Sequence, residues 1–273
     1  MPPCIVVIPC YNEADRLPVD AFAGFNARGH SVRFLMVDDG STDATQSVLQ
    51  SLHRRDPQRF SVLRLPQNSG KAEAVRRGIL SAMAEPVETV GFWDADLATP
   101  LEAIPEFLDT MQQNPQLQLV IGARVKLLGR HVERRPLRHY LGRVFATAAS
   151  LALRLPVYDT QCGAKMFRVT QQTRRLFATP FCTNWIFDVE LLARLVRLRK
   201  AAGLASPEQC VYELPLTQWR DVAGSKVRPR DFVKSFFELL RIYRRYLSRR
   251  AVWPPGEGLE LTEVLADESR RAA

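Results

Sequence analysis

No apolar run in this sequence of 273 residues approaches the length of about 18 residues that a membrane-spanning helix needs. The chain goes from Met1 almost directly into an expected strand at 4–9, which leaves no room for a signal peptide, so we expect a cytoplasmic protein. Cysteine is scarce: five residues without a Cys-x-x-Cys pair predict reduced, mostly buried thiols.

Two common glycine motifs for binding nucleotides are also missing. The first expected strand is not followed by Gly-x-Gly-x-x-Gly, which disfavours a dinucleotide site. No Gly-x-x-x-x-Gly-Lys-Ser/Thr occurs, which excludes a P-loop, and Asn-Ser-Gly-Lys at 68–71 is too short to be one.

Apolar runs and helical stretches alternate through the first half of the chain. Strands are expected at 4–9, 32–37, 60–65, 89–93 and 119–123, and helices at 19–28, 43–54, 71–83 and 100–113. This alternation predicts an α/β fold with a mostly parallel, Rossmann-like sheet and helices on both faces. The second half predicts a smaller extension, with helices at 137–153, 186–199 and 231–250 and strands at 164–169 and 210–214.

Asp94 and Asp96 directly follow the expected strand at 89–93. Two carboxylates this close are best tolerated with a cation between them, and oxygen ligands suit Mg²⁺ or Mn²⁺. The alternative is that Asp94 only ends the strand and Asp96 caps a turn before Pro100. We predict that both bind a metal, because the neighbouring strand ends are polar as well.

Polar side chains follow four expected strands, and the carboxyl ends of parallel strands share one edge of a sheet. We therefore expect them to meet in one cleft. Acids there can accept hydrogen bonds from ribose or base, and Lys71 and Arg124 can hold a diphosphate. The pattern predicts a nucleotide site. Its strand-end residues are Tyr11, Asn12, Glu13, Asp38, Asp39, Asp94, Asp96 and Arg124.

The net charge of +9 is concentrated in two stretches. Residues 124–143 contain seven Lys or Arg against one Glu, residues 226–250 contain nine against two acids, and the rest of the chain is net acidic. This distribution argues against a uniform basic coat for nucleic acid. Because apolar residues interleave both stretches, we predict surfaces for phosphate groups or for an anionic membrane.

Several motifs along the chain together resemble a known family. Ile-Pro-x-Tyr-Asn-Glu lies at 8–13, Val-Asp-Asp-Gly-Ser-Thr-Asp at 37–43, Gly-Lys at 70–71 and Asp-Ala-Asp at 94–96. In this order they resemble family 2 glycosyltransferases of the GT-A fold. Asp-Thr-Gln-Cys-Gly at 159–163, Trp185 before Phe-Asp-Val-Glu at 187–190, and Trp219 before Gly-Ser-Lys at 224–226 resemble the dolichyl-phosphate β-glucosyltransferase and mannosyltransferase branch. The likeness covers about residues 4–247.

The resemblance implies roles for individual residues and makes the smaller extension the acceptor side. Residues matching the family's nucleoside contacts are Pro9, Tyr11, Glu13, Val37 and Asp39. Residues matching its diphosphate and metal contacts are Asp94, Ala95 and Asp96. Residues matching its phosphate-binding cations are Arg124, Arg220 and Lys226, with Arg138 as a further match. Gln161 is either a turn residue or an acceptor-site residue.

The implied reaction is an inverting, metal-dependent transfer of a hexose to a polyprenyl or dolichyl phosphate at the membrane surface. Ala98 stands where mannosyl-transferring members have Gln, which favours UDP-glucose as the donor. A phosphate acceptor is already ionised at pH 7 and needs cations to steer it. A hydroxyl acceptor would instead need a carboxylate base, for which Asp188 and Glu190 are the candidates.

Two alternatives stay open at this stage. One is a soluble family 2 enzyme that uses GDP-mannose or another nucleotide sugar and a small hydroxyl or phosphate acceptor. The other is a basic module that binds nucleic acid or a membrane without catalysis. We expect a catalytic domain at 1–225, a basic amphipathic helix at 226–250 lying on the inner face of the membrane, and an acidic, partly disordered tail at 251–273.

Overall fold

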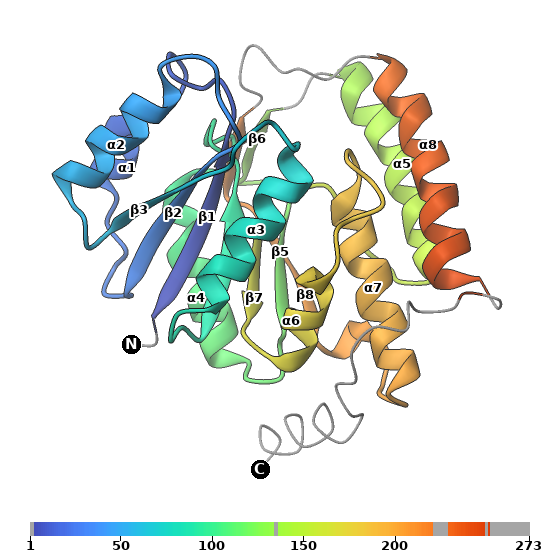
Figure 1. Ribbon diagram of the computed structural model, residues 1–273. Helices are drawn as coiled ribbons and strands as arrows, with labels where there is room; N and C mark the ends of the chain where they lie inside the picture. The colour runs from blue at the N-terminus through green and yellow to red at the C-terminus, as the bar shows by residue number, and fades with distance from the viewer. Residues whose placement is uncertain (1–2, 134–135, 221–228, 249–250, 252–273) are drawn as a thin grey trace.

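The computed structural model describes residues 3–133, 136–220, 229–248 and 251, with the backbone alone at 133, 136–139 and 229–233. Within these residues the main sheet has seven strands (Figure 1). They are β1 (Cys4–Cys10), β2 (Val32–Asp38), β3 (Phe60–Arg64), β4 (Thr89–Trp93), β5 (Leu119–Ala123), β7 (Ala164–Arg168) and β8 (Val211–Pro215). The order across the sheet is β3-β2-β1-β4-β7-β5-β8.

Most neighbours in this sheet are parallel, which confirms the predicted α/β class. The exception is β7, which lies antiparallel between β4 and β5. The close approach of these strands suits Gly91 of β4, since a Cβ there would lie 2.7 Å from the carbonyl oxygen of Lys165. Because β7 lies between them, β5, the strand that ends just before Arg124, is not a direct neighbour of β4.

Helices cover both faces of the sheet, and alternate residues of β1 enter the two cores. Ile5 and Val7 pack in the core with α3 (Lys71–Met83), α6 (Gln171–Ala178) and α7 (Phe187–Ala201). Val6 and Ile8 pack in the opposite core with α1 (Val19–Gly24), α2 (Thr45–Arg55) and α4 (Ile104–Gln113). This burial on both faces explains why β1 reads as a continuous apolar run.

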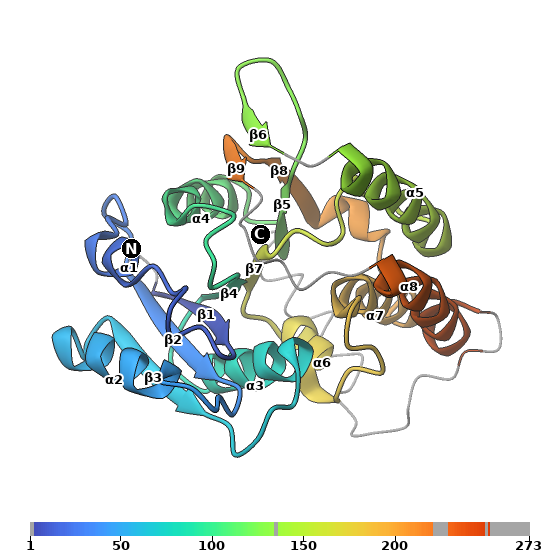
Figure 2. The same ribbon diagram turned by 90° about the horizontal axis from the view of Figure 1, so that it is seen from above.

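Two further helices lie beyond α7, side by side in both views (Figures 1 and 2). They are α5 (Pro136–Leu153) and α8 (Pro229–Ile242), and Phe145 of α5 contacts Phe236 of α8 edge to face. The expected helix at 231–250 changes to a π-helical turn, η3, at Tyr243–Leu247. No helix in the described part of the chain is long and apolar enough to cross a membrane.

A second, two-stranded sheet and one helix of the structure were not predicted from the sequence. The sheet pairs β6 (His131–Glu133) in parallel with β9 (Gln218–Arg220). The helix α6 also lacked a sequence prediction, and the expected helix at 19–28 ends at Gly24. All five cysteines are free and four of them are buried, as predicted, and burial raises the pKa of the Cys162 thiol to about 11.

Candidate active site

A cleft of about 340 Å³ opens at the carboxyl ends of β1, β2 and β4. After β1 the chain adds β2 and β3 on one side and then returns to place β4 on the other. Such a switch in strand order leaves a crevice where open α/β sheets bind ligands. The residues that line it are Pro9, Cys10, Tyr11, Glu13, Arg16, Asp39, Asn68, Gly70, Lys71, Ala74, Asp94, Ala95, Asp96 and Trp185.

The loop after β1 is held by the loop after β2. The backbone N–H of Asn12 donates to the Ser41 hydroxyl at 3.1 Å, and the N–H of Glu13 donates to the Thr45 hydroxyl at 2.8 Å. The N–H of Thr42 donates back to the side-chain oxygen of Asn12 at 2.9 Å. These bonds explain why the two motifs at 8–13 and 37–43 occur together: each fixes the other beside the cleft.

Asp39 is buried at the floor of the cleft and fixes the loop that leads into α3. Its two carboxylate oxygens accept the backbone N–H groups of Ser69 and Gly70, each at 2.8 Å. Burial raises the pKa of Asp39, with a further contribution from Asp38, although the two backbone bonds oppose the shift. Gly70 has φ +89°, a conformation that suits glycine and turns the chain into the first residue of α3, Lys71.

Lys71 and the two predicted metal ligands lie together. The Lys71 ammonium contacts Asp94 Oδ1 at 2.5 Å. Burial alone would lower the pKa of Lys71, but the nearby carboxylates, Asp94 first and then Asp188, outweigh it and raise the pKa. The pKa of Asp96 is raised by burial and by the charge of Asp94. Asp96 also accepts the backbone N–H of Ala98 at 3.1 Å.

The donor set at this point fits a divalent ion that shares its coordination with a substrate. No group of three or more His, Cys, Asp or Glu that could hold a metal occurs among the residues that the structure describes. Mg²⁺ and Mn²⁺ are commonly held by one or two carboxylates together with substrate phosphates. Asp94 and Asp96 supply two carboxylates. Burial first, and then the charge of Asp94, raise the pKa of Asp96, and a bound cation would favour its ionised form against both effects.

Gly163 packs directly against the carboxylate of Asp94. A Cβ at this position would lie 2.7 Å from Asp94 Oδ1 and closer still to Oδ2. The adjoining loop is anchored from below, because the buried ammonium of Lys165 donates to the carbonyl of Cys162 at 2.7 Å and to Asp188 at 2.5 Å. The loop at 159–163 therefore helps to determine where Asp94 points.

Arg124 does not line this cleft. Its guanidinium donates to both carboxylate oxygens of Asp159, at 2.6 and 2.7 Å, and lies 5.3 Å from the centre of the Trp219 ring. Arg220 follows Trp219 on β9, and its backbone N–H donates to the carbonyl of Ala98 at 3.1 Å. Arg124, which follows β5, and Arg220 of β9 therefore both lie near Trp219, and their role at the acceptor remains a prediction.

The remaining predicted residues differ in where they lie. Val37 is fully buried in the core, and Gln161 is half-buried in the loop at 159–163. Arg138 belongs to α5, but its side chain lies outside the described residues, as does the whole of Lys226. The structure adds Trp185 to the cleft, a residue more easily read from the sequence as a packing residue.

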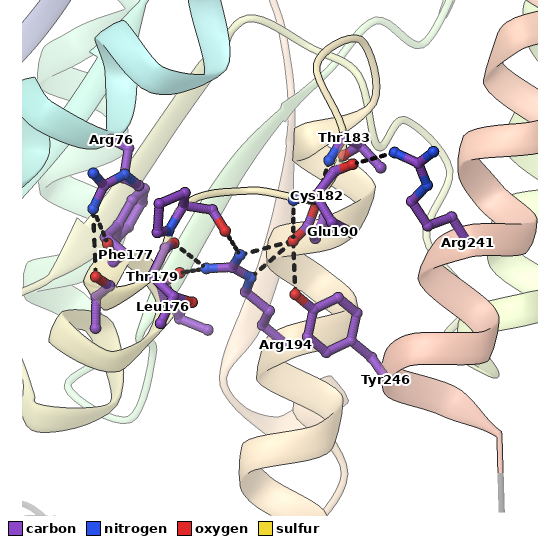
Figure 3. A network of polar contacts seen from close by, with 12 residues as sticks. Arg76, Leu176, Phe177, Thr179, Cys182, Thr183, Glu190, Arg194, Arg241 and Tyr246 are labelled. Atoms are coloured by element: carbon purple, nitrogen blue, oxygen red, sulfur yellow. Dashed lines mark hydrogen bonds and ion pairs between the residues drawn. The ribbon is translucent and has the colours of Figure 1, made fainter. Parts of the chain in front are cut away.

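Both candidate bases are occupied by other groups. Asp188 forms a buried ion pair with Lys165. Glu190 is fully buried and pairs with Arg194 at 2.7 Å (Figure 3). It also accepts the N–H groups of Cys182 and Thr183 and the hydroxyls of Thr183 and Tyr246. Burial alone would raise the pKa of Glu190, but Arg194 and these donors outweigh it, so the pKa is lowered.

Comparison with known proteins places the cleft within a recognised sequence family. The family model described as "Glycosyl transferase family 2" matches residues 5–185. A dolichyl-phosphate beta-glucosyltransferase from Dictyostelium discoideum is 32% identical over 257 residues, which cover 89% of this chain and 74% of the relative. The matched region includes Pro9 to Asp96 and Trp185, the residues that line the cleft.

Solved structures share the fold at lower identity. A mannosyltransferase from Pyrobaculum calidifontis in complex with GDP-Man and Mn²⁺ is 18% identical, with a TM-score of 0.61, covering 99% of this chain and 70% of that one. A glucosyl-3-phosphoglycerate synthase from Mycobacterium tuberculosis in complex with Mn²⁺ and UDP-glucose is 21% identical, with a TM-score of 0.58, covering 89% and 76%. These likenesses confirm the predicted GT-A fold.

Proposed function

We propose that this chain, which belongs to glycosyl transferase family 2, transfers a hexose from a nucleotide sugar to the phosphate of a polyprenyl or dolichyl phosphate. Glucose and UDP-glucose are favoured because the relative from Dictyostelium discoideum is named a dolichyl-phosphate beta-glucosyltransferase and Ala98 occupies a position where mannosyl-transferring members carry Gln. In-line attack on the anomeric carbon would invert an α-linked donor to a β-linked product.

The observation that carries the choice of acceptor is the engagement of both candidate bases. A hydroxyl nucleophile needs a carboxylate free to take its proton, within hydrogen-bond reach. Asp188 is held by Lys165, and Glu190 is saturated by Arg194 and its other donors. A phosphate monoester has a second pKa near 6 and arrives largely as a dianion at pH 7, so it needs no such base.

Donor binding is proposed at the cleft itself. Tyr11, Glu13 and Asp39 would surround the nucleoside, and Lys71 would bind the diphosphate. A divalent ion, Mg²⁺ or Mn²⁺, would be held by Asp94 and Asp96. When bound, such an ion neutralises charge on the leaving nucleoside diphosphate. The Mn²⁺ in the two solved structures supports this assignment, as does the presence of two carboxylates, Asp94 and Asp96, in the lining of one cleft.

The acceptor lipid and an anionic membrane surface are proposed to meet α5 and α8. Both helices expose large apolar side chains, and α8 and η3 add cations beside them. Basic residues near an anionic surface contribute about 1 kcal/mol each, so several are enough for reversible attachment. The exposed apolar residues are Tyr140, Leu141, Val144, Leu151, Phe236, Phe237, Leu240 and Tyr243, and the cations are Lys234, Arg241, Arg244 and Arg245.

The proposal is tested with two acceptors that differ only in the phosphate. Purified protein is incubated with labelled UDP-glucose, Mn²⁺ and either a polyprenyl phosphate or the matching polyprenol in mixed micelles. We expect label in the lipid fraction with the polyprenyl phosphate and not with the polyprenol. This labelling should be lost when the metal is chelated. Transfer to the polyprenol at a similar rate would favour a hydroxyl acceptor. Transfer only to water-soluble acceptors would favour the alternative, a soluble enzyme.

A further inference from the structure

The segment 179–186 connects α6 to α7 and carries Trp185 to the cleft. Its first half is fixed from α7, because the buried guanidinium of Arg194 donates to the carbonyls of Thr179 and Pro180 at 2.8 and 2.7 Å (Figure 3). Its middle is fixed by Glu190, which accepts the N–H groups of Cys182 and Thr183. This part of the segment is therefore tied to the core of the protein.

The end of the segment is tied instead to α8. One carboxylate oxygen of Glu238 accepts the backbone N–H groups of both Trp185 and Ile186, at 3.2 and 3.1 Å. One turn further along α8, Arg241 donates to the carbonyl of Cys182 at 2.9 Å. The N-cap residue of α7, Ile186, makes no side-chain cap, and a carboxylate from a different helix binds the two N–H groups just before the first turn. A negative charge there also interacts favourably with the α7 dipole.

Trp185 comes to the cleft from a different part of the chain than the other lining residues. Every other lining residue lies between Pro9 and Asp96, whereas Trp185 immediately precedes α7. The first turn of α7 lies near the Asp94 loop, because Asp188 binds the Lys165 ammonium, which also binds the carbonyl of Cys162, next to the Gly163 that packs against Asp94. Trp185 is 39% exposed, so a broad aromatic face is available to a ligand next to the diphosphate position.

We propose that Trp185 forms the wall of the cleft against the hexosyl group of the donor, and that Glu238 is a positioning residue that holds Trp185 there. This inference rests on the proposed function, because it assumes a nucleotide sugar in the cleft. In a nucleotide sugar the hexosyl group is attached to the diphosphate at the end away from the nucleoside, so the proposal places it next to Trp185 and away from Tyr11 and Asp39. The contribution of Trp185 is therefore expected for a sugar nucleotide and not for the free nucleotide.

The test compares two ligands by isothermal titration calorimetry with Mn²⁺ present: UDP-glucose and UDP. Trp185→Ala is expected to lower the affinity for UDP-glucose about 10-fold, which corresponds to about 1.4 kcal/mol. The affinity for UDP is expected to change by less than about 2-fold. Glu238→Ala is expected to lower the affinity for UDP-glucose about 3- to 10-fold, again with little effect on the affinity for UDP. Glu238→Gln keeps an acceptor for both N–H groups and is expected to restore most of the loss. Lys200→Ala, an exposed change at the C-terminal end of α7, is the matched control.

Hydrogen exchange gives a second readout that does not depend on a ligand. The amides of Trp185 and Ile186 are expected to exchange faster in Glu238→Ala than in the wild type or in Glu238→Gln. Unchanged exchange, or an unchanged ratio of UDP-glucose to UDP affinity in Trp185→Ala, overturns this inference and leaves the proposed function standing. A wild-type protein that binds neither ligand contradicts the proposed function and this inference with it.

Discussion

Replacing Gly163 by alanine should damage the site while barely affecting the fold. Gly163 does not adopt a positive φ, so its backbone accepts alanine without strain. The added methyl, however, would lie 2.7 Å from Asp94 Oδ1, whereas ordinary contacts begin at 3.4 Å. Because Oδ2 would be closer still, the carboxylate of Asp94 must move by more than about 1 Å, which also disturbs its contact with Lys71.

The expected consequence is a loss of function out of proportion to the loss of stability. A displacement of about 1 Å at reacting groups can cost about 100-fold in rate, and we expect a loss of that order in transfer. Because the metal would be held by Asp94 and Asp96, affinity for Mn²⁺ should fall about 10-fold. Overpacking at the end of one side chain should cost only about 1 kcal/mol of unfolding free energy.

The assays are Mn²⁺ binding in the presence of UDP, hexosyl transfer and thermal unfolding. Gly142→Ala is the matched control, since a Cβ at this position in α5 meets nothing within 4 Å. It should leave all three quantities close to those of the wild type, or raise stability slightly, as expected for alanine within a helix. Unchanged Mn²⁺ affinity and transfer in Gly163→Ala would refute the reasoning that this glycine sets the position of Asp94.

Three other changes have expected outcomes. Arg194→Leu leaves Glu190 buried without its cation, and chemical denaturation should show a loss of about 3–5 kcal/mol. Since burial and Asp94 raise the pKa of Asp96, metal-free stability should fall as pH rises from the ordinary carboxyl range through that raised pKa. Asp96→Asn should reduce this slope, to which Asp39 also contributes, and raise the melting temperature by about 2–4 °C at pH 7, while abolishing Mn²⁺ binding. Lys71→Met should raise the affinity for Mn²⁺ in the absence of nucleotide, because the metal no longer competes with an ammonium for Asp94. The same change should lower the affinity for UDP. Calorimetry that shows weaker Mn²⁺ binding or tighter UDP binding would contradict this prediction.

Local patterns in the sequence were sufficient to predict the elements around the cleft. A buried strand shows as an apolar run, and the residue after it must lie at the sheet edge, so Glu13, Asp39 and Asp94 could be expected together. The loops that carry them are short and hold one another through backbone bonds. Their positions therefore follow from a few neighbouring residues.

Long-range pairing is where prediction from the sequence ends. A strand was expected at 164–169 and lies at 164–168, but its local sequence does not specify its direction or its neighbours. Its insertion between β4 and β5 moves Arg124 out of the cleft, and Asp159, far along the chain, binds it there. Trp185 reaches the cleft only because α7 and α8 position the segment 179–186. No local pattern contains that information.

The most direct test of the account is the position of the metal. Crystals of the protein with UDP-glucose and Mn²⁺ can be measured at the manganese absorption edge, where anomalous scattering locates the ion. The account predicts one peak between the carboxylates of Asp94 and Asp96 and the diphosphate, with the uracil between Tyr11 and Asp39. A nucleotide bound elsewhere, or a bound nucleotide whose Mn²⁺ contacts neither Asp94 nor Asp96, would contradict it.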